Sequence, residues 1–206
     1  MDDDDFGYRY IANTPLAWLF VAHEMIAAGN LCFRRYARLN PKELESFGGY
    51  HRDISLTSFC MLYAFALEGL LKALWLAHGN VAAKAGTLDK TLRAHGHDLH
   101  GWWARASMPN PTREERAVLR LLTACIELGR YPIRSKARAD SGPNLEPYGA
   151  RALIMRMLDA SHSALHAQMP KGAVDILPPP LRSLGVRRPR HRYDHLVPGT
   201  SRRRRV

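Results

Sequence analysis

The sequence predicts an all-α protein in which four or five helices pack as a bundle around one long central helix. Apolar residues recur at helical spacing in several segments, and no stretch keeps the alternation of a strand at any length. Recognisable start and stop signals bound these segments. With 206 residues, 46% of them hydrophobic and 24% charged, the chain can form one domain with a real core.

The first helix is predicted to begin at Thr14-Pro15, because proline is tolerated in the first turn of a helix. Apolar residues then repeat at helical spacing as far as Ala27. Gly29-Asn30 weakens the pattern, but residues 31–39 can continue it until Asn40-Pro41. Residues 47–50 follow as a loop.

The central helix is predicted to start near Asp53 or Ser55, which are both good N-caps, and to end at Gly79-Asn80. It is apolar nearly all round, which is typical of a buried helix. It is also long enough to cross a membrane. However, Glu68 and Lys72 near its centre would each cost about 2.5–3.5 kcal/mol in a bilayer, so we expect the core helix of a soluble protein.

The remaining elements follow in order. Residues 81–95 read as a connector with one short helix around residues 88–92, and residues 98–106 as another short helix. In that helix, Trp102-Trp103 favours packing in the core or a dimer over stacking on bases. Thr112 and Glu115 form a capping box that starts a helix running to Gly129. A polar loop then leads to a last helix over residues 149–169.

The domain limits follow from a change in composition. Residues 1–169 carry the helical bundle, with a net charge of +3, whereas residues 170–206 carry +8 of the total +11. This Pro- and Arg-rich tail has little to bury, so we expect it to be disordered. Its arginines can bind nucleic-acid phosphates without sequence preference, or they can simply keep the chain soluble. They are Arg187, Arg188, Arg190, Arg192, Arg202, Arg203, Arg204 and Arg205.

The sequence gives little sign of metal or cofactor chemistry. Cys32, Cys60 and Cys125 show no metal-ligand spacing and are predicted to be buried free thiols. His95, His97 and His100 are close in sequence but lack a further ligand at suitable spacing. Phosphate-loop and HExxH patterns are absent. We therefore expect no metal and no cofactor. The acidic start of the chain is unlike a signal peptide, which predicts a cytoplasmic protein.

A polar cluster beside the central helix is the main site prediction. Glu68 and Lys72 lie one turn apart on one face of an otherwise apolar helix. Charges held against a core need polar partners, and four other residues can supply them. The predicted cluster contains Glu68, Lys72, His97, Asp98, Arg130 and Tyr131. The alternative is that each of these groups is a helix cap or a solvated surface pair.

The order of these motifs resembles the HEPN superfamily of bacterial helical domains. The motifs are LEGLLKALWLAHG, then GHDL, then a helix that ends in RYP, within residues 59–132. The resemblance implies a four- or five-helix bundle, a homodimer, and a setting beside a nucleotidyltransferase or in defence and toxin–antitoxin loci. Many such proteins are metal-independent ribonucleases with an Arg-x4–6-His pattern near the start of a late helix.

The chain departs from that catalytic pattern. Arg130 stands at the expected position, but the residues that follow it include no histidine at the required spacing. Arg156 and His162 have suitable spacing, yet they would point to different sides of a regular helix. Arg93 and His100 match only at the wrong place. Arg130, Arg156 and His162 are thus the candidate catalytic residues, and whether the chain is an enzyme stays open.

Two functional hypotheses follow. The first is a HEPN-like protein in an RNA-linked defence or toxin–antitoxin role that binds or cleaves RNA. The second is a non-catalytic helical module that dimerises or pairs with a nucleotidyltransferase, an antitoxin or another protein. Neither hypothesis involves a membrane.

Overall fold

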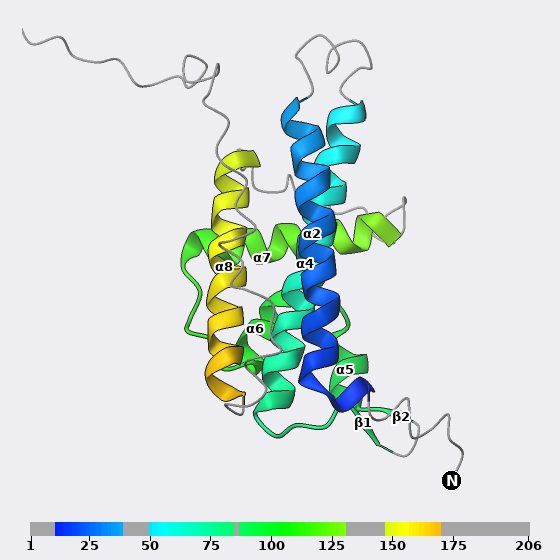
Figure 1. The fold of residues 1–206 in the computed structure, drawn as a ribbon, viewed down its shortest axis with the longest axis vertical. Coiled ribbons are helices and arrows are strands. Elements are labelled where there is room, and N and C mark those ends of the chain that lie inside the picture. The colour runs from blue at the N-terminus through cyan, green and yellow to red at the C-terminus, as the bar shows by residue number, and fades with distance from the viewer. Residues whose placement is uncertain (1–10, 39–49, 85–86, 131–146, 170–206) are drawn as a thin grey trace, which may run out of the picture.

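The computed structural model describes residues 11–38, 50–84, 87–130 and 147–169. Four long helices dominate this part of the chain: α2 (Pro15–Arg38), α4 (Tyr50–Ala77), α7 (Arg113–Arg130) and α8 (Pro147–Gln168). Figure 1 shows α2, α4 and α8 running alongside one another, while α7 crosses them. The all-α bundle is therefore confirmed. The predicted tail lies outside the described residues.

Helix α2 is continuous through Gly29 and Asn30, where the sequence left its continuation open. Both residues are buried against α4. The ring of Tyr63 fills the space beside Gly29, and its hydroxyl donates a hydrogen bond of 2.8 Å to Oδ1 of Asn30. These tertiary contacts offset the low helix propensity of the two residues.

Helix α4 is the central helix, and it contacts α2, α6, α7 and α8. Its side chains from Ala66 to Leu76 are all buried, so the all-round apolar pattern is explained. The predicted stop is also confirmed. Gly79 has a φ of +87°, which suits glycine, and the side chain of Asn80 donates to the carbonyl of Trp75 at 2.8 Å.

The segment after α4 differs from the prediction in detail. A short antiparallel pair, β1 (Ala83–Lys84) and β2 (Thr87–Leu88), precedes α5 (Lys90–His95), so the predicted short helix begins two residues later. The side chain of Asn13 bonds both N–H groups of residues 82 and 83 and the carbonyl of residue 83. This distant amide shapes the segment, and local periodicity could not reveal it.

The two helices that follow begin where their caps predict. Asp98 caps α6 (Leu99–Arg105) by accepting a hydrogen bond of 3.1 Å from the N–H of Gly101. Thr112 and Glu115 form the predicted capping box of α7, with reciprocal hydrogen bonds of 2.8 and 3.2 Å. Helix α8 starts and ends within two residues of its predicted limits.

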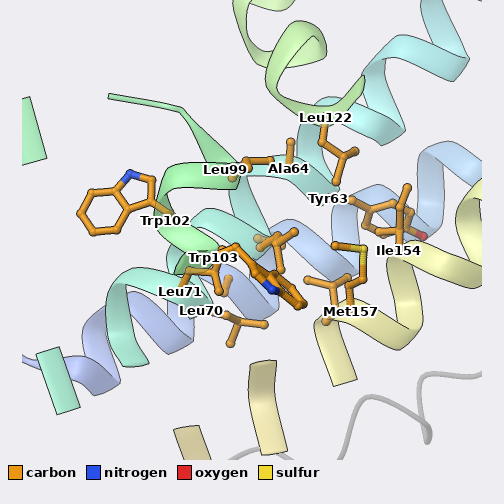
Figure 2. Packing of buried hydrophobic residues seen from close by; sticks show 14 of the residues in the cluster. Tyr63, Ala64, Leu70, Leu71, Leu99, Trp102, Trp103, Leu122, Ile154 and Met157 are labelled. Carbon is orange, nitrogen blue, oxygen red and sulfur yellow. The ribbon is translucent and has the colours of Figure 1, made fainter. Parts of the chain in front are cut away.

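The hydrophobic core lies around α4 (Figure 2). Trp102 and Trp103 are buried in it, so the prediction of core packing is confirmed, and stacking on bases is excluded for the buried rings. Cys60 and Cys125 are buried free thiols as predicted, while Cys32 is half-buried.

Two helical stretches are long and apolar enough to cross a membrane by length and composition. They differ in how much of their most apolar 18-residue stretch is buried inside the protein. This share is 83% for Ser58–Ala77 within α4 and 33% for α2. Burial in the bundle accounts for the apolar character of α4, whereas the rest of the described protein leaves a broad outer face of α2 uncovered.

Candidate functional site

The structure brings together three of the six residues predicted to form the polar cluster. Glu68 and Lys72 are buried in α4, with 5% and 8% of their surface exposed. The Lys72 ammonium donates to Oε1 of Glu68, and Oε2 of the same carboxylate lies 2.8 Å from Nδ1 of His97. One carboxylate therefore serves two nitrogen groups from different parts of the chain.

Aromatic rings enclose the Lys72 side of this site. The ammonium lies 5.1 Å from the ring centre of Trp18 and 5.2 Å from that of Trp102. Such contacts stabilise a cation, most strongly where water is excluded. Trp102 is itself held by a hydrogen bond of 3.1 Å from its indole nitrogen to the carbonyl of Gly96. Sequence spacing signalled the Glu68–Lys72 pair but not this aromatic enclosure.

His97 forms the outer edge of the site. Its side chain keeps 27% of its surface exposed, and its ring packs edge-on against Phe65 with centres 6.0 Å apart. The site is therefore a buried ion pair with a histidine at its rim. Glu68 orients the imidazole and Lys72 balances the carboxylate charge.

Of the other three predicted members, Asp98 does not join the cluster, and the side chains of Arg130 and Tyr131 are not described. Asp98 is exposed, and its carboxylate caps α6 instead of reaching Lys72, because the N–H groups of that first turn are nearer. Arg130 is the last residue of α7, but its side chain lies outside the described residues, as does Tyr131.

The candidate catalytic residues of α8 lie on different sides of the helix, as their spacing predicts. Arg156 is exposed, whereas His162 is buried with 8% of its surface exposed and packs against His23 of α2. The two side chains do not form one site within a single chain. The tail arginines lie outside the described residues.

The three neighbouring histidines considered as metal ligands have separate surroundings. The His95 ring contacts the Arg105 guanidinium, His97 binds Glu68, and His100 is exposed. Within the ranges that the structure describes, no three metal-ligating side chains already converge on one point.

A second polar network was missed by the sequence reasoning. Arg151 of α8 donates to Oδ1 of Asn30 at 2.8 Å and to the hydroxyl of Tyr63 at 3.3 Å. Its guanidinium also lies 4.7 Å from the ring centre of Phe33. The network joins α2, α4 and α8. Its only local signal was a polar asparagine in the middle of an apolar helical pattern.

The pKa values of two histidines are perturbed at the contact between α2 and α8. Burial lowers the pKa of His23, and the neighbouring His162 lowers it further. Burial likewise lowers the pKa of His162, assisted by His166 and opposed by Asp159. Both imidazoles therefore favour the neutral form.

No family model, curated protein or solved structure matches this chain.

Proposed function

We propose that the chain is a helical interaction protein that dimerises through the outer face of α2 and is not itself catalytic. The exposed apolar side chains of α2 carry this proposal. Phe20, Val21 and Leu31 keep 47%, 52% and 65% of their surface exposed. Apolar side chains gathered on one exposed face are characteristic of interaction surfaces.

The spacing of these residues supports a second copy of the chain as the occupant. Isologous dimers bury the same patch on both subunits. Along the outer face of α2, the side chains form successive layers: residues 20–21, residue 24, residues 27–28, residue 31 and residues 34–35. In an antiparallel pair centred on Ala27 and Ala28, the small central residues let the helices approach closely. Leu31 of one copy then lies opposite the Glu24 layer of the other, between its Val21 and Ala28 layers.

Charge complementarity supports the same pairing. Glu24 is the sole acidic residue of α2, and Arg34 and Arg35 are both exposed near its C-terminal end. The antiparallel arrangement places Glu24 of one copy within about one turn of both arginines of the other, a distance their side chains can cover. A parallel pair would instead set like charges side by side.

Analytical ultracentrifugation at tens of micromolar protein tests this proposal. We expect a dimer for the wild type and at least a tenfold weaker dimer for Leu31→Glu, since the new carboxylate of each copy would lie opposite Glu24 of the other. Val81→Glu is the matched control, because Val81 is 51% exposed but lies outside α2. This control should dimerise like the wild type.

Charge reversal adds a second test of the pairing. Glu24→Arg should weaken the dimer, and combining it with Arg34→Glu and Arg35→Glu should restore it. A monomeric wild type would overturn the proposal, as would equal effects of Leu31→Glu and Val81→Glu. Flotation with anionic lipid vesicles through the same residues would assign the face to a membrane and would also overturn it.

The second candidate function is RNA binding in a HEPN-like protein of a defence or toxin–antitoxin system. The charge of +8 on residues 170–206 favours it, together with the motif order within residues 59–132. The cellular partner would then be a nucleotidyltransferase or an antitoxin, and the location cytoplasmic. Burial of most of the apolar window of α4 supports a protein outside the membrane.

RNA binding by the full chain at low and moderate salt tests the second candidate. Replacing Arg202–Arg205 by serine should weaken binding and flatten its salt dependence, since fewer phosphates are neutralised. Cleavage would be followed in the same samples, with Arg130→Ala and His162→Ala as variants. Absence of binding at low salt would exclude the RNA-linked function.

A further inference from the structure

The half-buried His23 of α2 packs against the buried His162 of α8, and one ring nitrogen of each is left without a partner. The ring centres of His23 and His162 are 5.4 Å apart. In the part of the chain that the structure describes, neither Nε2 atom has a hydrogen-bond partner, and both atoms are inaccessible to solvent. His162 as a whole has only 8% of its surface exposed.

Buried nitrogen atoms without partners need an explanation. Nearly all buried polar atoms in folded proteins are hydrogen-bonded, and an unsatisfied one costs about 1–3 kcal/mol. Here two such atoms occur on rings in direct contact, whereas other buried polar side chains, such as Asn30 and Ser161, are satisfied. A phenylalanine at either position would fill the same space without this cost. The pair of imidazoles therefore points to a bound group that both Nε2 atoms can contact at once.

The separation of the two rings fits coordination of a metal ion. A zinc–nitrogen bond of about 2.0–2.1 Å puts each ring centre about 3.2 Å from the ion, and a tetrahedral angle then separates the centres by about 5.2 Å. The observed separation is 5.4 Å. Burial lowers the pKa of both histidines, which keeps the imidazoles in the neutral form that metals bind.

A third histidine lies one turn further along α8. His166 follows His162 by four residues, and their ring centres are 6.5 Å apart. Side chains at this spacing share one helix face. His166 is exposed, so its ring can rotate toward the other two at little cost. In the described ranges, no three potential ligands converge in the present arrangement. Rotation of the His166 ring is therefore needed to complete a set of three ligands.

We propose that His23, His162 and His166 bind a divalent transition-metal ion, best matched by Zn²⁺, which clamps α2 to α8. Imidazole nitrogen suits zinc, copper and nickel, and three protein ligands leave a fourth position for water. The site uses the inner side of α2. It is therefore independent of dimerisation through the outer face of that helix.

Metal titration of the full chain tests this proposal. Chelator-treated protein would be titrated with Zn²⁺ in a calorimeter and with Co²⁺ in a spectrophotometer. We expect one equivalent per chain, a Co²⁺ spectrum of tetrahedral intensity without a sulfur charge-transfer band, and a higher melting temperature with Zn²⁺. A sulfur band would instead assign the ion to the cysteines and overturn the proposal.

Variants locate the site. His162→Phe and His23→Phe should abolish the binding, and circular dichroism of each should confirm that it folds. His166→Ala changes an exposed residue, so it should fold normally and weaken binding at least tenfold. The exposed His100→Ala and the tail variant His191→Ala/His195→Ala are controls that should bind like the wild type. Unchanged binding in His162→Phe, or no binding by the wild type at millimolar Zn²⁺, would overturn the proposal.

Discussion

His97 and Glu68 are 29 residues apart in the chain, yet Nδ1 of the histidine lies 2.8 Å from Oε2 of the carboxylate. Glu68 belongs to the middle of α4, while His97 stands in the turn between α5 and α6. Because the other oxygen of Glu68 accepts from Lys72, the carboxylate bonds both groups and anchors the α5–α6 turn to the core.

Glu68→Gln should destabilise the protein strongly. The substitution keeps the shape but removes the charge that balances Lys72 between Trp18 and Trp102. Removing one partner of a buried ion pair leaves an uncompensated charge, so we expect a loss of about 3 kcal/mol in the free energy of unfolding. Urea denaturation measures it.

Two further variants show whether that loss comes from the unpaired charge. Glu127→Gln alters an exposed carboxylate of α7, outside the proposed dimer face, and should change the free energy of unfolding by less than about 0.5 kcal/mol. The double variant Glu68→Leu/Lys72→Leu should lose less than Glu68→Gln, since it strands no charge. A loss well below 1 kcal/mol for Glu68→Gln would show that the pair behaves as a solvated one.

The protein should lose stability as the pH falls from about 7.5 to 5.5. The pKa values of His23 and His162 are lowered in the folded state, so the unfolded chain binds protons first, near the ordinary value of 6.5. Their contribution is fully present above that pH and is lost below it. Melting temperatures measured in a chelating buffer across this pH range test whether stability falls as the pH falls. His162→Phe should make the melting temperature depend less on pH, while the exposed His100→Gln should leave this pH dependence unchanged.

Gly29→Ala should destabilise the protein, although alanine usually favours a helix over glycine by about 1 kcal/mol. A Cβ atom at this position would lie 2.8 Å from Cε1 of Tyr63, too close for a buried ring to accept without moving. We expect a net loss of about 1–3 kcal/mol from overpacking. Adding Tyr63→Leu should make the alanine substitution much less harmful, and a stabilised Gly29→Ala single variant would contradict the described packing.

Asn30→Leu should cost about 1–3 kcal/mol, since it leaves the Tyr63 hydroxyl and the Arg151 guanidinium without their shared acceptor. A double-mutant cycle with Arg151→Met measures the coupling directly. We expect a coupling energy above about 0.5 kcal/mol, as found for residues of one hydrogen-bond network. Additive effects would mean that the two side chains act independently.

The sequence alone determined the helical architecture, because the signals for a helix act within one or two turns. The apolar pattern around α4, the capping box at Thr112 and Glu115, and the stop at Gly79 are each written in neighbouring residues, and each is found where it was predicted. The pairing of Glu68 with Lys72 is equally local, since four residues separate them on one helix face.

Only the tertiary structure decided which distant side chains meet. Arg151 reaches Asn30 across 121 residues, and His162 packs against His23 of another helix. It also decided that His97, and not its neighbour Asp98, binds Glu68, because the first turn of α6 engages the Asp98 carboxylate. Such contacts depend on how helices pack together, which periodicity within one helix does not specify.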